Sequence, residues 1–136
     1  MATLACDVRR ETIHDHVVHL VAARFQEPGR YRIRTGTARG RRLRDEAPPP
    51  LPDLAGYRSD ARPATIEWLA EVETEDTLTE AQARGQWRRS ASMLVPLYLV
   101  VPQGTRHRAW SLAFQAGVAV HHVFEYRVDE GGVELS

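Results

Sequence analysis

Three acidic residues offer the clearest chemistry in this sequence. Glu71 and Glu73 are separated by one residue, and Asp53 follows a proline in an earlier segment. In a β-strand, residues two apart leave the same face, so the two glutamates would bring their carboxylates within a few ångströms of each other. Carboxylate oxygens are ligands that Mg²⁺ prefers, and the ion usually takes one or two of them directly. We therefore predict a Mg²⁺ or Mn²⁺ site at Glu71 and Glu73, with Asp53 able to supply a third oxygen.

Both glutamates lie in the segment Ala64 to Thr74, which has the strongest strand pattern in the chain. Alternation predicts one face with Ile66, Trp68, Ala70 and Val72, and another with Glu67, Leu69, Glu71 and Glu73. A helix pattern follows directly, which favours a central position in the sheet. The alternative is that the glutamates form the solvated face of an edge strand, where water screens their charges.

The helix predicted from Thr77 to Ser92, with Thr77 or Thr79 as its cap, carries a polar stripe. Gln82, Gln86 and Arg89 project from one side, whereas Trp87 projects from another with Ala81, Arg84 and Ala91. Such a stripe could bind a nucleic-acid backbone or orient a metal-bound water. The alternative is an ordinary solvent-facing surface.

The other elements place this segment in a mixed sheet. We expect a helix over Val8–Phe25, strands over Tyr31–Thr35, Leu51–Arg58, Leu97–Val101 and Val118–Val128, and a helix over Arg106–Ala116 that Gly117 ends. The first helix would bury Ile13, Val17, Leu20 and Val21, with Asp15, His19 and Ala22 opposite, and Val133–Leu135 could fold back as a short edge. The order α-β-β-β-α-β-α-β predicts an α/β (α+β) fold, a mixed β-sheet flanked by helices, in one domain of residues 1–136.

Arginine supplies all 18 basic residues, so every lysine-based mechanism is excluded. The stretch from Arg30 to Arg44 is rich in arginine, and Arg32, Arg34, Arg41 and Arg42 could follow a nucleic-acid backbone. Because aromatic residues are not interleaved, backbone contact is favoured over base stacking. The alternative is a solvated strand face and loop.

Composition is that of an ordinary globular domain, with 43% hydrophobic and 26% charged residues and a formal net charge of zero. No apolar run is long enough to span a bilayer, and the lone Cys6 fits a cytoplasmic protein, so we expect no membrane association. His14, His16 and His19 lack a further ligand at the spacing of a metal site, so structural or surface roles are expected for them.

The chain resembles the PD-(D/E)XK nuclease superfamily, which has the restriction-endonuclease-like fold. The resemblance rests on Pro52-Asp53, on Glu71-Val72-Glu73 one strand later, on Gln82 and Gln86 in the next helix, and on the order of elements. It implies that Asp53 and Glu71 bind the metal and that Gln86 belongs to the site. The motif lysine is replaced by Glu73, which could bind metal or accept a proton from water but cannot place a positive charge beside a phosphate.

Three functions are compatible with these features. The first is a Mg²⁺- or Mn²⁺-dependent hydrolase of DNA, or of RNA, with Asp53, Glu71, Glu73 and Gln86 as catalytic residues and Arg89 in support. The second is a catalytically inactive nuclease-fold module that binds nucleic acid or a protein partner. The third is a small scaffold or oligomeric subunit whose arginine face meets an acidic partner, with the strand Val118–Val128 as a candidate dimer edge.

Overall fold

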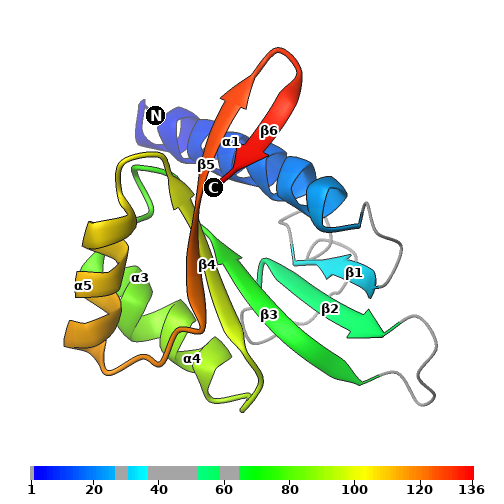
Figure 1. Ribbon diagram of the computed structural model, residues 1–136. Coiled ribbons are helices and arrows are strands. Elements are labelled where there is room, and N and C mark those ends of the chain that lie inside the picture. The colour runs from blue at the N-terminus through cyan, green and yellow to red at the C-terminus, as the bar shows by residue number, and fades with distance from the viewer. Residues whose placement is uncertain (1, 27–30, 37–51, 59–64) are drawn as a thin grey trace, which may run out of the picture.

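The computed structural model describes residues 2–26, 31–36, 52–58 and 65–136 (Figure 1). The predicted Arg-rich loop, the proline-rich entry to the second strand and the turn at 59–63 lie outside the described residues, as do Arg41 and Arg42.

A six-stranded sheet forms the centre of the fold, and its strands lie side by side in the order of the sequence. The first three strands pair antiparallel, β3, β4 and β5 pair parallel, and β6 returns antiparallel to β5. The strands are β1 (Tyr31–Thr35), β2 (Leu54–Arg58), β3 (Ile66–Val72), β4 (Leu97–Pro102), β5 (His122–Asp129) and β6 (Gly132–Leu135). Because β3 lies between β2 and β4, the alternative of a solvated edge strand is wrong.

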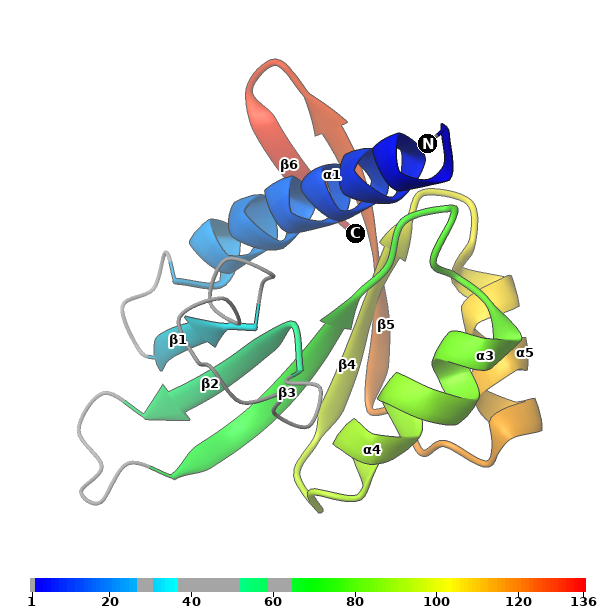
Figure 2. The ribbon, with the colours of Figure 1, turned by 180° about the vertical axis from the view of Figure 1, so that it is seen from behind.

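Helices cover the sheet in two groups (Figures 1 and 2). The helix α1 (Ala2–Gln26) packs against β1, β3 and β6. A second helical segment contains α3 (Glu80–Gln82), the π-helical turn η1 (Ala83–Trp87) and α4 (Arg88–Ala91), and it contacts α5 (Arg106–Ala116). The predicted mixed α/β sheet flanked by helices is confirmed. β6 adds the short strand that the diglycine turn allowed.

The predicted caps of two helices are also present. Thr79 is the N-cap of α3, and its side chain accepts a hydrogen bond from the backbone N–H of Gln82. Gly117 ends α5 in the left-handed conformation, with φ of 69°, which glycine adopts at little cost. Thr79 therefore sets where the second helical segment begins, and Gly117 sets where α5 ends.

Each face of the sheet has its own hydrophobic core, as expected for strands buried on both sides. On the α1 side the core includes Val18, Val21, Leu54, Ala70, Val72 and Val100. On the side of α4 and α5 it includes Ala55, Leu69, Trp87, Leu99, Ala109 and Ala113. Odd-numbered residues at the end of β3 therefore point toward the second helical segment, and this places Glu71 and Glu73 beneath it.

The buried face of α1 agrees only in part with the predicted one: Val17 and Val21 are buried as predicted, whereas Leu20 is only half-buried. Ile13 is 51% exposed, whereas Val18 and Ala22 are buried. The helix is therefore rotated by about one residue, so that His14 points toward the sheet. Apolar residues occupy neighbouring positions around this helix, and the sequence pattern did not define one stripe.

The register between β2 and β3 shifts by one residue. Gly56 pairs with Trp68, but the next residue, Tyr57, pairs with Ile66. Glu67 is therefore an extra residue in β3, as in a β-bulge, and Ile66 turns to the face opposite Trp68. The predicted alternation is wrong at Ile66 for this reason.

The predicted dimer edge is also wrong. β5 pairs with β4 on one side and with β6 on the other, and backbone hydrogen bonds between Glu125 and Ser136 extend the second pairing. The strand begins at His122 instead of Val118. β5 is thus an internal strand of the sheet, although neither neighbour covers its whole length.

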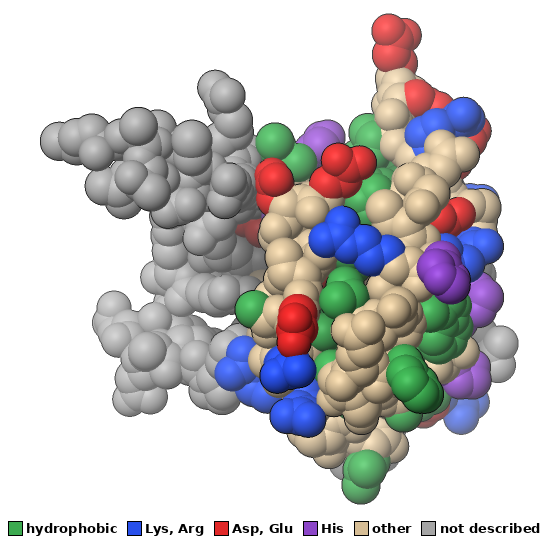
Figure 3. All heavy atoms as spheres, turned by 90° about the vertical axis from the view of Figure 1, so that its left-hand side faces the viewer, with side chains coloured by type: hydrophobic (Ala, Val, Ile, Leu, Met, Phe, Trp, Pro, Cys, Tyr) green, Lys and Arg blue, Asp and Glu red, His purple; other side chains and the backbone are tan. Residues whose placement is uncertain are grey.

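In a view onto the second group of helices, acidic, basic and hydrophobic side chains are intermixed on the described surface (Figure 3). Phe114 on α5 is 87% exposed. Within the described ranges, no helix has both the length and the apolar character required to cross a membrane.

Candidate metal centre

The antiparallel pairing of β2 and β3 brings the three predicted carboxylates together. Asp53 directly precedes β2, and Leu54 pairs with Ala70 near the end of β3. Glu71 lies at the end of β3, and Glu73 follows it. One ligand oxygen from each of the three residues lies within 4.8 Å of the others.

This cluster is buried. Glu71 and Glu73 are 0% exposed and Asp53 is 4% exposed. Among the arginines whose side chains are described, which excludes those of residues 2–12, none forms an ion pair with any of the three carboxylates. The cation that pairs with this cluster is His14, whose Nε2 lies 3.2 Å from Oδ2 of Asp53. Because three buried carboxylates face it, protons or a metal ion must neutralise the remaining charge.

Side chains of the second helical segment hold each glutamate by one oxygen. Oε1 of Glu73 accepts hydrogen bonds from Nε1 of Trp87 at 2.8 Å and from Nε2 of Gln82 at 3.2 Å. Oε1 of Glu71 accepts from Oγ of Ser90 at 2.6 Å and from Nε2 of Gln86 at 3.2 Å. These donors orient the carboxylates.

The second oxygen of each glutamate has no partner. Oε2 of Glu71 and Oε2 of Glu73 are both buried and accept no hydrogen bond. An unsatisfied buried acceptor costs free energy, so native proteins rarely leave one without a use. A hard cation bound between these oxygens and Asp53 would satisfy both, so the donor set fits Mg²⁺.

The π-helical turn explains why Trp87 belongs to this set. The sequence placed Trp87 on a different side of the helix from Gln82 and Gln86, as regular α-helical spacing requires. In the structure, residues Ala83–Trp87 form a π-helix, whose wider turn brings residues five apart close to one line. Gln82 and Trp87 therefore both reach Glu73, whereas Gln86 and Ser90, four apart, both reach Glu71.

His14 of α1 is a further member of the site that the sequence did not predict. Its Nε2 lies 2.8 Å from the carbonyl oxygen of Val72 and 3.2 Å from Oδ2 of Asp53. Both neighbours are acceptors, so Nε2 carries a hydrogen. The backbone N–H of Val72 donates to the same Oδ2 at 2.8 Å. Asp53 is thereby fixed from two sides, and only the correct rotation of α1 would have revealed His14.

Burial dominates the protonation of the two glutamates. Burial, together with the negative charge of Asp53, raises the pKa of Glu71 well above its ordinary value. Burial also raises the pKa of Glu73 to about 7, although hydrogen bonds from Thr77 and Trp87 oppose the shift. For His14, burial lowers the pKa, but the hydrogen bond and charge of Asp53 outweigh it and raise the pKa to about 9. The metal-free cluster therefore retains protons that a cation would displace.

The predicted nucleic-acid contacts are only partly brought together. Arg32 and Arg34 are exposed on β1, and their partners in the register, Tyr57 and Ala55, share their face of the sheet. Arg89 donates to Oε1 of Gln86 at 3.4 Å. Arg34 and Arg89 border one cavity, which lies beside the acidic cluster.

Comparison with family models, curated proteins and solved structures gives no match. Fold and site together define a mixed α/β protein with a buried three-carboxylate cluster that could bind a metal ion.

Proposed function

We propose that this protein is a Mg²⁺- or Mn²⁺-dependent phosphodiesterase that acts on nucleic acid, with an arrangement like that of PD-(D/E)XK nucleases. The observation that carries the proposal is the convergence of Asp53, Glu71 and Glu73, together with two buried carboxylate oxygens that lack partners. A bound Mg²⁺ would stabilise negative charge on a phosphodiester and promote deprotonation of an attacking water.

The residues of the site divide into distinct roles. Asp53 and Glu71 are the metal ligands, and Gln86 orients Glu71 through its amide hydrogen bond. Glu73 either binds the ion as a third ligand or accepts a proton from water. The positive charge that a motif lysine would supply comes instead from arginine or from a second cation.

Arginine supports nucleic acid as the substrate. Guanidinium groups bind phosphate oxygens through two parallel hydrogen bonds, and Arg34 and Arg89 stand on opposite sides of the cavity beside the carboxylates. The first 62 residues also contain 12 of the 18 arginines. A phosphodiester backbone that passes Arg34 would have one phosphate near the acidic cluster.

A cleavage assay tests the proposal. Purified protein is incubated with single-stranded and duplex DNA and RNA, with Mg²⁺, Mn²⁺ or a chelator, and compared with Glu71→Gln. The matched control is Glu67→Gln, which removes the same charge from the same strand outside the cluster. We expect metal-dependent cleavage by the parent and the control only. Equal cleavage by Glu71→Gln would remove the site assignment.

A second candidate is a catalytically inactive nuclease-fold module that binds nucleic acid. The replacement of the motif lysine by Glu73 and the complete burial of both glutamates favour it. It predicts nucleic-acid binding that weakens as salt increases and no cleavage with any divalent ion. Any metal-dependent cleavage that Glu71→Gln abolishes would exclude it.

A further inference from the structure

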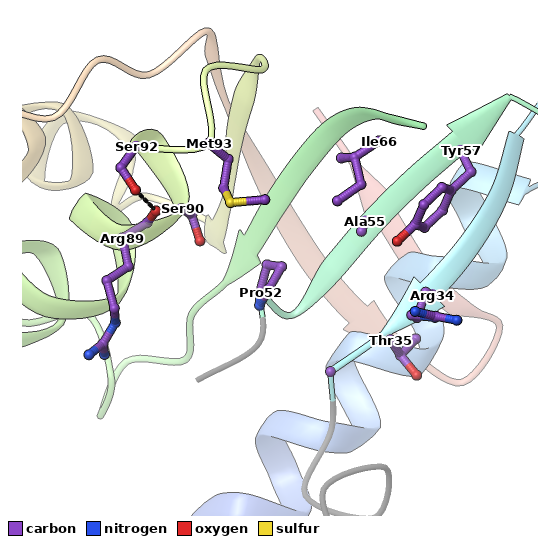
Figure 4. Close-up of a pocket in the computed structure, with 11 residues that line it drawn as sticks. Arg34, Thr35, Pro52, Ala55, Tyr57, Ile66, Arg89, Ser90, Ser92 and Met93 are labelled. Atoms are coloured by element: carbon purple, nitrogen blue, oxygen red, sulfur yellow. Dashed lines mark hydrogen bonds between the residues drawn. The ribbon is translucent and has the colours of Figure 1, made fainter. Parts of the chain in front are cut away.

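A cavity of about 410 Å³ lies beside the acidic cluster, between the sheet and the end of the second helical segment (Figure 4). Ala55, Tyr57 and Ile66 line it from β2 and β3, and Met93 extends toward them from the turn after α4. Ile66 reaches this face only because the register shifts at Tyr57. The volume is within the range of small-molecule sites.

Two lining residues connect the cavity to the candidate metal centre, although none of the three carboxylates lines it. Ser90 lines the cavity, and its Oγ donates to Oε1 of Glu71 at 2.6 Å. Pro52, which also lines it, directly precedes Asp53. A group held in the cavity would therefore lie one side chain away from two of the carboxylates.

The lining combines an apolar interior with positive charge. Arg34 borders the cavity from β1, with its guanidinium carbon 5.9 Å from the centre of the Tyr57 ring. Arg89 borders it from α4, and its guanidinium donates to Oε1 of Gln86. The described lining residues include no aspartate or glutamate, and neither arginine forms an ion pair within the described part of the chain. This combination fits a flat group with apolar faces that is joined to anionic groups.

We infer that the cavity binds one unstacked nucleobase of the strand whose phosphodiester lies at the acidic cluster. A base can enter such a cavity only after it leaves the stack, which costs least in a single strand or at a frayed end. Single-stranded nucleic acid is therefore the substrate class. This inference rests on the proposed function and replaces the sequence-based preference for backbone contact alone.

Binding without divalent cations tests the cavity separately from catalysis. The probes are a short single-stranded DNA and an oligonucleotide of equal length in which every base is replaced by an abasic site, so that the phosphates are matched. Fluorescence anisotropy gives both affinities. We expect the base-bearing strand to bind the parent protein about tenfold more tightly, as stacking and apolar contact with one base would provide.

Two variants that introduce a negative charge at neighbouring residues test whether the cavity causes the preference for the base-bearing strand. Met93 lines the cavity and is 53% exposed, whereas Leu94 is 92% exposed and does not line it. We expect Met93→Glu to lose the tenfold preference and Leu94→Glu to retain it, with unchanged circular dichroism in both. Because the side chains of Met93 and Leu94 are exposed, we expect both variants to fold.

The outcomes separate this inference from the proposed function. Equal affinity for the two probes, or a preference that survives Met93→Glu, overturns the cavity assignment even if the protein cleaves DNA. Loss of the preference in both variants also overturns it, because a general charge effect would then explain the change. A preference that only Met93→Glu removes, in a protein that never cleaves, supports the cavity and removes the hydrolase.

Discussion

Glutamates of β3 and β5 show how differently this fold treats the same side chain. Glu125 of β5 accepts hydrogen bonds from the backbone N–H groups of Gly104 at 2.7 Å and Arg106 at 3.0 Å, where α5 begins. The backbone N–H of Arg106, with smaller contributions from its neighbours, lowers the pKa of Glu125. Glu71 and Glu73 have raised pKa values instead, because they are buried with side-chain donors on one oxygen only.

The difference indicates which carboxylate has a complete environment. Glu125 lies at the positive end of a helix, where backbone donors stabilise its charged form without a further ligand. Glu71 and Glu73 each keep a buried oxygen without a donor, and Asp53 adds a third carboxylate. The protein alone satisfies the first environment, whereas the second requires protons or a cation. Four experiments can contradict or sharpen this contrast.

The largest effect is expected on hydrolysis. Glu71→Gln removes one proposed metal ligand, and we expect metal-dependent cleavage to fall by about 100-fold or more, whereas Glu125→Gln should change it by less than about twofold. Initial rates at saturating Mg²⁺ would measure both. If the two variants lost activity equally, the carboxylates of β3 would have no special role.

The second-largest expected effect is the stabilisation of the folded protein by bound Mg²⁺. A ligand that binds only the folded state at about 100 times its dissociation constant adds about 2.7 kcal/mol to the free energy of unfolding. We expect Mg²⁺ to raise the melting temperature of the parent and of Glu125→Gln, but not of Asp53→Asn. An increase in Asp53→Asn equal to that of the parent would place the ion elsewhere.

In the metal-free protein, the free energy of unfolding should depend on pH through the acidic cluster. Glu73 has an ordinary pKa of 4.5 that is raised to about 7, so the folded state binds more protons than the unfolded state between these values. The free energy of unfolding should therefore fall as pH rises through this window, by about 3 kcal/mol. His14, with its pKa raised from 6.5 to about 9, extends the fall above neutral pH.

Chemical denaturation at several pH values would measure this decrease. Glu73→Gln cannot ionise, so its decrease between about pH 5 and pH 7 should be smaller than that of the parent. Mg²⁺ should reduce the decrease in the parent because the ion favours the deprotonated cluster. A metal-free stability that rises across the window would contradict the protonated state of the buried glutamates.

The sequence predicted the acidic cluster because short-range rules determine it. Spacing by two places Glu71 and Glu73 on one face of a strand, and the Pro52-Asp53 pair precedes an adjacent strand. Antiparallel pairing then brings Asp53 to the end of β3. These steps require only strand periodicity and the order of elements, both of which are visible in the chain.

What the sequence did not show depends on departures from regular geometry. Trp87 reaches Glu73 through a π-helical turn, and Ile66 enters the cavity through a register shift. His14 joins Asp53 because Ile13, which the apolar pattern favoured for burial, is exposed. Each departure is a small local change whose free energy depends on tertiary packing, so residue periodicity alone cannot predict it.

The smallest effect concerns Glu125. Glu125→Gln retains the size of the side chain but removes the charge that the backbone N–H groups of Gly104 and Arg106 stabilise, so we expect a loss of about 1 kcal/mol in the free energy of unfolding. Because the pKa of Glu125 is lowered, this contribution is present above its ordinary value of 4.5 and disappears as pH falls further. Thermal unfolding at neutral and acidic pH measures it. Metal-free Glu71→Gln should show the opposite sign at neutral pH, because burial raises the pKa of Glu71 so that it must take up a proton on folding, whereas glutamine is neutral in both states. If both variants lost stability equally, the donors on Glu71 would already complete its environment, and no cation would be required there.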